Sequence, residues 1–219
     1  VQQVKKRRFS GVLGINIGKN FDTPNDQAAD DYLLCLEKVY PHADYVTINI
    51  SSPNTRGLRD LQNTEQLDSL LAVLNSRRLE LANEYQKRVP LVVKVAPDLE
   101  DEQVPGMAQS IVRNEFDGLI ATNTTISRDA VKGMKHADEQ GGLSGAPVKD
   151  KANHILAEFR ANLPPEIALI GTGGITTGDD AAEKIKLGAD LVQFYTGFVY
   201  KGPDLVKDSL QAIKAYRSA

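Results

Sequence analysis

YVTINISSPNT, residues 45–55, opens as a β-branched apolar run and changes within a few positions into hydroxyl and amide side chains. The apolar part has the composition and length of a buried strand. The segment Asn49 to Asn54 then places two amides and two hydroxyls close together where the strand ends. Strands that end in such residues are typical of parallel α/β sheets, whose carboxyl ends carry the ligand site.

The same pattern recurs along the chain, so the sequence predicts six strands separated by helices. The predicted strands are Gly11 to Ile17, Tyr45 to Ile50, Leu91 to Val95, Gly118 to Thr122, Ala168 to Gly171 and Asp190 to Tyr195. Helical periodicity fills the intervals and follows the last strand. The predicted helices are Asp30 to Tyr40, Glu65 to Gln86, Asp101 to Asn114, Asn153 to Ala161, Asp179 to Leu187 and Asp204 to Tyr216.

The alternation of strands and helices predicts a parallel sheet, either doubly wound or closed as a barrel. All six strand ends carry polar or small residues, which favours the barrel because an open sheet gathers its ligands at one switch point. A complete TIM (β/α)8 barrel needs eight strands and about 250 residues. We therefore expect residues 1–219 to form a single domain with about six of the eight strands, the N-terminal strands being absent.

Composition excludes several classes of function. The net charge of -3 gives no large field of one sign, which argues against a nucleic-acid partner. Cys35 is the one cysteine, so no intrachain disulfide can form. None of the three histidines adjoins a strand end, which argues against a metal centre or a serine–histidine triad.

Lys94 is the most informative charged residue, because β-branched residues flank it in a strand that should be buried. A buried amine needs an anionic partner, either a structural ion pair or an anionic ligand such as a reduced flavin. Asn49 and Asn54 could read the edges of a cyclic imide or a carboxylate. The alternative for the segment around them is a Pro–Asn turn with local hydrogen bonds.

Two glycine-rich pieces, residues 141–145 and 171–174, could let backbone N–H groups approach a phosphate. Neither satisfies the dinucleotide fingerprint, and Ser144 lacks the second glycine of a nucleophile elbow. The second piece follows the penultimate strand and Tyr195-Thr196 follow the last, where many barrels bind phosphate. The long irregular segment Thr125 to Lys149 is expected to cover the site.

INISSPNTRGLR, residues 48–59, resembles the dihydroorotate dehydrogenases, and further matches follow in order along nearly the whole chain. They are GVLGINIGKN (11–20), VKVAPD (93–98), TNTT (122–125), the glycine-rich pieces at 141–145 and 173–175, and residues 193–196. Cytosolic members carry a cysteine base in this motif, whereas membrane-associated, quinone-reducing members carry serine. Ser52 occupies that place, so the resemblance is to the C-terminal part of the quinone-dependent, serine-base group (class 2).

The resemblance implies FMN as cofactor and oxidation of dihydroorotate to orotate in de novo pyrimidine (UMP) biosynthesis. Ser52 would be the catalytic base that removes the C5 proton, with Thr55 as a possible relay. The residues implied to bind substrate are Asn49, Asn54, Asn123 and Thr124. The residues implied to bind FMN are Asn16, Asn49, Lys94, Thr122, Gly145, Gly174, Tyr195 and Thr196.

The sequence departs from the family at its start, where members carry a membrane-associated segment, the first barrel strands and loops that touch both ligands. The resemblance implies a quinone acceptor and peripheral attachment to the cytoplasmic face of the inner membrane through that segment, this piece itself being soluble. We expect the 219 residues alone to bind FMN weakly or not at all. The alternatives are a catalytically silent fragment or structural module, or a related cysteine-type flavin barrel such as a dihydropyrimidine dehydrogenase domain.

Overall fold

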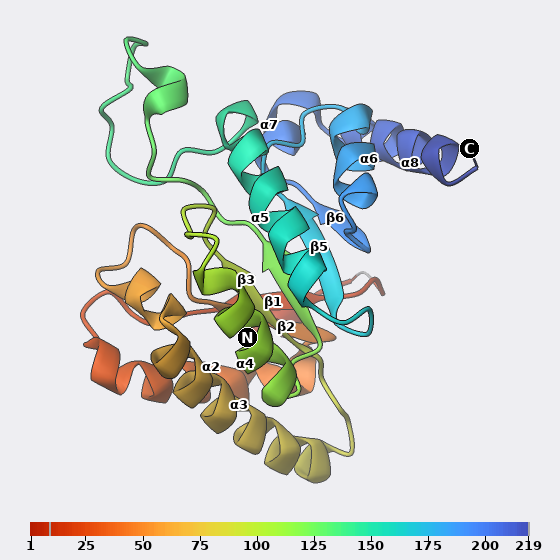
Figure 1. Cartoon of the computed structure of the whole chain (residues 1–219). Helices are drawn as coiled ribbons and strands as arrows, with labels where there is room; N and C mark the ends of the chain where they lie inside the picture. Colours follow the sequence, from red (N-terminus) through yellow and green to blue (C-terminus); the bar gives the residue numbers. More distant parts are fainter. Residues whose placement is uncertain (9, 219) are drawn as a thin grey trace.

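The computed structural model describes residues 1–8 and 10–218, and its centre is one sheet of six parallel strands (Figure 1). The strands follow one another across the sheet in chain order, β1 to β6. Their bounds are β1 Gly14–Ile17, β2 Tyr45–Asn49, β3 Leu91–Val95, β4 Gly118–Ala121, β5 Ala168–Thr172 and β6 Leu191–Gln193. This order, with a helix after each of the first five strands, is that of consecutive βα units in a partial barrel.

The described residues form eight helices, of which α2 to α6 connect successive strands, as the apolar periodicity predicts. They are α1 Gln2–Lys5, α2 Ala28–Val39, α3 Thr64–Tyr85, α4 Gln103–Arg113, α5 Lys149–Asn162, α6 Gly178–Lys186, α7 Thr196–Lys201 and α8 Asp204–Arg217. The best-capped of them is α6, where the Thr177 hydroxyl accepts from the Asp180 N–H and the Asp180 carboxylate accepts from the Thr177 N–H. This cap fixes the chain between the glycines after β5 and the helix.

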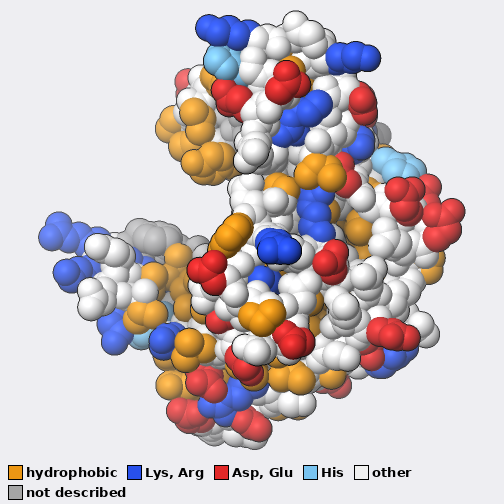
Figure 2. Space-filling model, turned by 90° about the vertical axis from the view of Figure 1, so that its left-hand side faces the viewer, with side chains coloured by type: hydrophobic (Ala, Val, Ile, Leu, Met, Phe, Trp, Pro, Cys, Tyr) orange, Lys and Arg blue, Asp and Glu red, His pale blue; other side chains and the backbone are white. Residues whose placement is uncertain are grey.

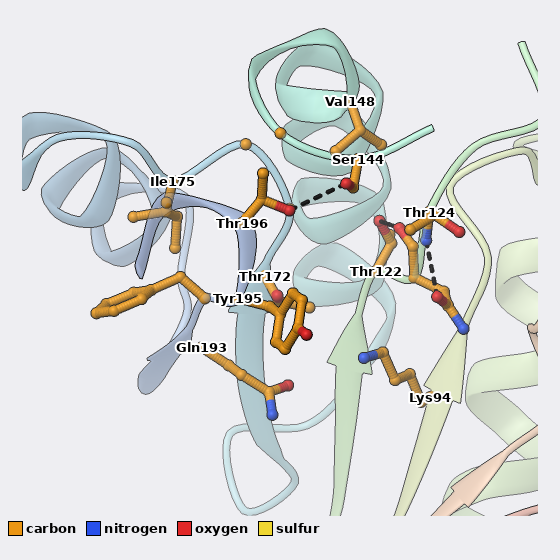
Figure 3. Close-up of a pocket in the computed structure, with 16 residues that line it drawn as sticks. Lys94, Thr122, Thr124, Ser144, Val148, Thr172, Ile175, Gln193, Tyr195 and Thr196 are labelled. Carbon is orange, nitrogen blue, oxygen red and sulfur yellow. Dashed lines mark hydrogen bonds between the residues drawn. The ribbon is translucent and has the colours of Figure 1, made fainter. Parts of the chain in front are cut away.

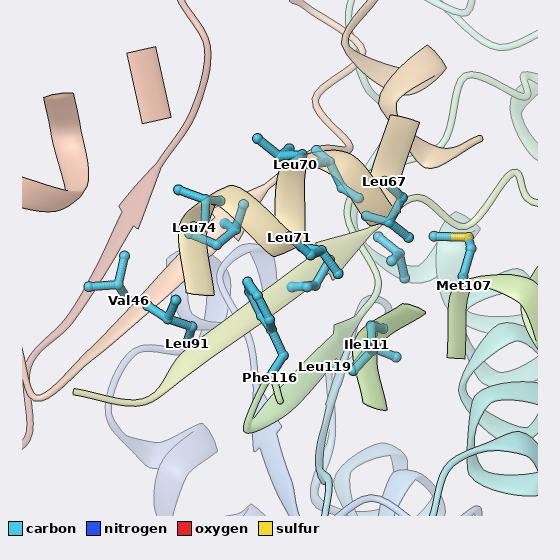
Figure 4. Packing of buried hydrophobic residues seen from close by; sticks show 14 of the residues in the cluster. Val46, Leu67, Leu70, Leu71, Leu74, Leu91, Met107, Ile111, Phe116 and Leu119 are labelled. Atoms are coloured by element: carbon cyan, nitrogen blue, oxygen red, sulfur yellow. The ribbon is translucent and has the colours of Figure 1, made fainter. Parts of the chain in front are cut away.

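The helix-covered face of the sheet carries the hydrophobic core. Side chains alternate along a strand, so Val46 and Ile48 of β2, and Leu91 and Val93 of β3, point to one face. All four are fully buried. Figure 4 shows the leucines of α3 and the apolar residues of α4 packed against this face. Burial of this apolar layer is the main force that holds the sheet in shape.

The opposite face of the sheet becomes polar toward the carboxyl ends of the strands. Strand register pairs Asn49 with Lys94, and the alternate residue of each neighbouring strand shares their face. Farther along the sheet, Thr172 pairs with Gln193 on that same face. One row of polar side chains therefore runs across the carboxyl end of the sheet.

Most element boundaries differ by one to four residues from those predicted, and two of these shifts have a clear cause. β1 begins at Gly14 rather than Gly11, because its pairing with β2 begins at Tyr45. β6 ends at Gln193 rather than Tyr195, since the chain turns there into the short helix α7, which the periodicity did not reveal. These shifts leave the order of the elements as predicted.

The long segment after β4 projects from the body as a loop (Figure 1). Its base is closed by an antiparallel bridge in which Thr125 and Leu143 exchange both backbone hydrogen bonds. The Arg128 guanidinium donates to the carbonyls of Ile126, Glu139 and Gly141, which joins the two arms. Figure 2 shows a deep notch on one face of the molecule, with acidic and basic side chains interspersed around it.

Among the described residues, no helix combines the length and apolar character that crossing a bilayer requires.

Candidate active site

A cavity of about 430 Å³ opens at the carboxyl ends of β3 to β6. It unites eight of the residues that the sequence singled out: Lys94, Thr122, Asn123, Thr124, Gly145, Gly174, Tyr195 and Thr196. These residues come from four strands and the loops that follow them, as expected for a barrel site. Figure 3 shows the side chains of Lys94, Thr122, Thr124, Tyr195 and Thr196 arranged around one space.

Lys94 contributes an amine to this cavity. It belongs to β3 and points into the space below Thr122 (Figure 3). Among the described residues, nothing forms an ion pair or hydrogen bond with its ammonium. Burial lowers the pKa of the Lys94 amine, with no carboxylate to offset the cost. The ion-pair alternative is therefore not what the structure contains, and an anionic ligand would complete the site.

The loop after β5 supplies a backbone surface for an anion. Gly174 has a φ of +79°, and a Cβ at this position would lie 2.5 Å from the Cα of Lys149. Only glycine allows this approach between the β5 loop and the start of α5. The Lys149 amine binds Asp180 at 2.8 Å and Glu183 at 3.0 Å, which ties α5 to α6. We call Gly145, Gly174, Tyr195 and Thr196 the glycine side of the cavity.

Across the cavity, Asn123 and Thr124 belong to a hydrogen-bonded set of amides and hydroxyls that extends beyond the cavity itself. We call this set the amide side: Asn49, Ser51, Ser52, Asn54, Asn123 and Thr124. The Asn123 amide donates to Ser51 Oγ at 3.0 Å and to Asn49 Oδ1 at 3.3 Å. Ser51 Oγ donates to Asn49 Oδ1 at 3.1 Å. These bonds hold the side-chain oxygen of Asn49 toward Ser51 and Asn123, which leaves the NH₂ group of Asn49 for a ligand.

Ser52 and Asn54 lie in the loop after β2. Ser52 Oγ accepts a hydrogen bond from the Asn54 N–H at 3.3 Å. The loop is packed against the base of the projecting segment, where a Cβ on Gly142 would lie 1.8 Å from Thr124 Oγ1 and 2.9 Å from Pro53 Cγ. The projecting segment therefore contacts the site at its base.

Four predicted site residues do not line the cavity itself. Asn49 adjoins it through its pairing with Lys94 and its bond from Asn123. Ser52 and Asn54 stand beside it on the loop after β2. Asn16 lies on β1 and pairs with Thr47 of β2. Thr47 is two residues before Asn49 on the same strand, so both point to the face that Asn16 shares. The structure thus gathers all of these positions at the carboxyl end of one sheet.

Sequence reasoning missed four polar residues of the site: Ser51, Ser144, Thr172 and Gln193. Ser51 is fully buried and holds two amides in place. Ser144 Oγ accepts from Thr196 Oγ1 at 3.0 Å and so connects the two ends of the glycine side (Figure 3). Alternation along the strands could have identified Thr172 and Gln193, because both share the face of Lys94.

The fold and the site together define a class: a (β/α)-barrel protein with a lysine, an amide cluster and a glycine-lined surface converging at the carboxyl ends of its strands. Within that class, the chain belongs to the dihydroorotate dehydrogenase family, because the family model "Dihydroorotate dehydrogenase" matches residues 1–216.

Individual relatives agree with this assignment. "Dihydroorotate dehydrogenase (quinone)" of Burkholderia thailandensis is 57% identical over 213 residues, which cover 97% of this chain and 62% of the relative. The protein of that name from Burkholderia pseudomallei strain 668 is 56% identical over the same share. The chain thus spans 62% of the length of these curated relatives.

Solved structures also match. Ligand-free dihydroorotate dehydrogenase from Eimeria tenella superposes with a TM-score of 0.87 at 37% identity, covering 97% of this chain and 64% of that one. The complex of the Eimeria tenella enzyme with ferulenol gives a TM-score of 0.84 at 38% identity, covering 92% and 57%. The predicted fold class is confirmed by these matches and by the six-stranded parallel sheet.

Proposed function

We propose that the full-length protein is a quinone-dependent dihydroorotate dehydrogenase that oxidises dihydroorotate to orotate in pyrimidine biosynthesis. The observation that carries the proposal is Lys94, a half-buried lysine that faces the cavity at the mouth of the sheet and has no partner among the described residues. Because this amine also faces a cavity, an anionic or strongly polar ligand bound there would offset the cost of its burial. The amide side and the glycine side flank this lysine, which suits a ligand with a planar head and a phosphate tail.

The residues fit FMN as that cofactor. Asn16, Asn49, Lys94 and Thr122 would contact the ring and the ribityl chain. The backbone at Gly145, Gly174, Tyr195 and Thr196 would hold the phosphate, because N–H groups free of Cβ obstruction can converge there. When bound, FMN accepts the hydride that leaves C6 of dihydroorotate. The region covered by residues 1–219 would act in this as one domain.

Substrate binding falls to the amide side. Asn49, Asn54, Asn123 and Thr124 offer donors and acceptors suited to the imide edge and the carboxylate of orotate. The hydrogen bonds among Asn49, Ser51 and Asn123 fix these amides before the ligand arrives. Such preorganisation favours the reacting geometry, since little reorientation is needed when substrate binds.

Ser52 would remove the C5 proton. A serine hydroxyl is a weak base at neutral pH, so the loop must favour its deprotonated form. The Asn54 N–H that donates to Ser52 Oγ supports this role, because it stabilises negative charge on that oxygen. Water exclusion by the projecting segment would strengthen the effect. Thr55, three residues on, is the candidate proton relay.

The test uses the full-length gene product. The purified protein should be yellow, contain one FMN per chain, and reduce its flavin when dihydroorotate is added without oxygen. A quinone such as decylubiquinone should then reoxidise it. A colourless protein that neither takes up FMN nor oxidises dihydroorotate would refute the proposal.

The acceptor and the location follow from the same proposal. The relatives carry the word quinone in their names, and Ser52 stands where the cytosolic group has cysteine. We infer that the full-length protein uses a membrane quinone and associates peripherally with the cytoplasmic face of the inner membrane. Flotation with lipid vesicles measures this directly, and a full-length protein that stays with the soluble fraction would contradict it.

A further inference from the structure

Arg59 makes a three-way connection that no role assigned above requires. Its side chain lies on the loop after β2 and is only 20% exposed. Its Nε donates to the Ser51 carbonyl at 3.2 Å, Nη1 to Asp98 Oδ2 at 2.8 Å, and Nη2 to the Thr124 carbonyl at 2.9 Å. One guanidinium therefore bonds to residues that follow β2, β3 and β4.

Asp98 is the counterpart that fixes the guanidinium. Its carboxylate, 12% exposed, accepts from Arg59, the Thr125 hydroxyl and the Ile126 N–H, and it contacts Lys151 at 3.4 Å. Burial alone would raise the pKa of this carboxyl, but these bonds outweigh burial and hold the pKa below its usual value. Asp98 is therefore ionised at neutral pH and pairs with Arg59 through charge-assisted hydrogen bonds.

The connected positions frame the reacting groups. Ser51 precedes Ser52, and its buried hydroxyl bonds to Asn49 and Asn123. Thr124 belongs to the opposite loop and contacts the ligand side of the cavity. The Arg59 carbonyl further accepts from Gln62, whose Oε1 accepts from the Ala96 N–H just after β3. The spacing between the base loop and the substrate-anchoring loop thus depends on one planar cation.

We propose that Arg59, held by Asp98, is a positioning residue for proton removal: it sets the place of Ser52 relative to the amides that hold the substrate. The inference rests on the proposed function. A guanidinium suits this task because its fixed fork can serve three acceptors at once, whereas a lysine ammonium is a point charge on a flexible stem. Arg59 does not line the cavity, so it would act through the loops.

The test is Arg59→Lys in the FMN-loaded full-length protein, with flavin reduction by dihydroorotate followed without oxygen. Because displacement of a reacting group by about 1 Å can cost about 100-fold, we expect reduction to slow by about 10- to 100-fold at saturating substrate. The FMN content and Tm should change little, and deuteration at C5 should slow the variant more than the normal protein. Asp98→Asn should act in the same direction and serves if Arg59→Lys does not fold.

A matched control is Arg77→Lys. Arg77 binds Glu37 at 2.8 Å and also Glu80, away from the cavity, and its replacement should leave the reduction rate unchanged. A second readout compares how much Arg59→Lys slows flavin reduction in the normal protein and in the Ser52→Ala variant. If Arg59 acts through Ser52, the effect nearly disappears in the second background.

Several outcomes would overturn the inference. Equal effects of Arg59→Lys in both backgrounds would do so, as would a lower Tm and FMN content with an unchanged rate per bound flavin. An unchanged C5 isotope effect would also count against it. If the unsubstituted protein did not oxidise dihydroorotate, the proposed function would fail and this inference with it. If the unsubstituted protein and the Arg59→Lys variant both turned over dihydroorotate at the normal rate, the positioning role would be refuted while the proposed function stood.

Discussion

The two walls of the cavity are built in opposite ways. The amide side is held by side chains that bond to one another and by Arg59, which bonds to its backbone, whereas on the glycine side Gly145 and Gly174 present backbone without a Cβ. The first arrangement fixes the direction of individual donors and acceptors. The second leaves N–H groups accessible to a diffuse charge. The contrast suggests that changes on the amide side alter the rate of reaction, and changes on the glycine side alter cofactor affinity.

Ser52→Ala should show the largest loss of reaction rate among changes on the amide side. Removing a positioned base typically costs about 100- to 10,000-fold in rate, so flavin reduction by dihydroorotate should slow by that factor near neutral pH. FMN binding should stay within about threefold, because the hydroxyl lies on the amide side. Stopped-flow absorbance and flavin titration measure the two quantities. Weakened FMN binding with an unchanged rate would contradict the expectation that the amide side governs the rate and the glycine side governs FMN affinity.

Lys94→Met tests the residue between the two walls. Loss of a buried electrostatic partner in a water-excluded site costs about 100-fold, which we expect for flavin reduction in the variant. The matched control is Lys184→Met. Lys184 is also buried with a lowered pKa but does not line the cavity, so its replacement should leave the rate unchanged. Equal rate losses in the two variants would show that burial, rather than position, matters.

Gly174→Ala tests the glycine side. The φ of +79° costs an alanine about 1–2 kcal/mol, and the new Cβ would meet the backbone of Lys149. FMN affinity should fall at least about tenfold, since 1.4 kcal/mol is tenfold in binding. Gly133→Ala is the control, because Gly133 has a φ of +80° with no atom near its Cβ position. Equal losses of FMN affinity would assign the effect to backbone strain alone.

Lys184→Met should change stability and nothing else. Burial lowers the pKa of this amine to about 8 from its usual 10.5, and no described atom accepts a hydrogen bond from it. Between those pH values the unfolded chain holds a proton that the folded chain has lost, so stability rises with pH across the window. At pH 7 the variant should gain about 1–3 kcal/mol, and the gain should vanish near pH 10.5.

Urea unfolding at pH 7, 9 and 10.5 measures the effect of Lys184→Met. The exposed Lys207 of α8 gives a control variant, Lys207→Met, which should show no such pH dependence. A loss of stability at pH 7 would mean that the buried amine makes a favourable interaction in the folded chain.

The sequence predicted the strands well because each is a short apolar run bounded by polar or glycine residues. Their alternation was enough to expect one common site at the carboxyl ends, where the structure pairs Asn49 with Lys94. The Arg59 connection could not be predicted, because its partners lie 39 and 65 positions away. Ser51 could not be predicted for a related reason. The motif identifies its neighbour Ser52 as the base, while the role of Ser51 depends on a side chain 72 positions away.

The bridge between Thr125 and Leu143 has a practical consequence for the segment that it closes. Residues 126–142 are tied at their base and bear an outward Met134, 62% exposed. A fluorophore attached through Met134→Cys would sit on this arm outside the site. Burial raises the pKa of the native Cys35 thiol, so a maleimide would prefer the introduced cysteine at neutral pH. Fluorescence from this label would report movement of residues 126–142 over time.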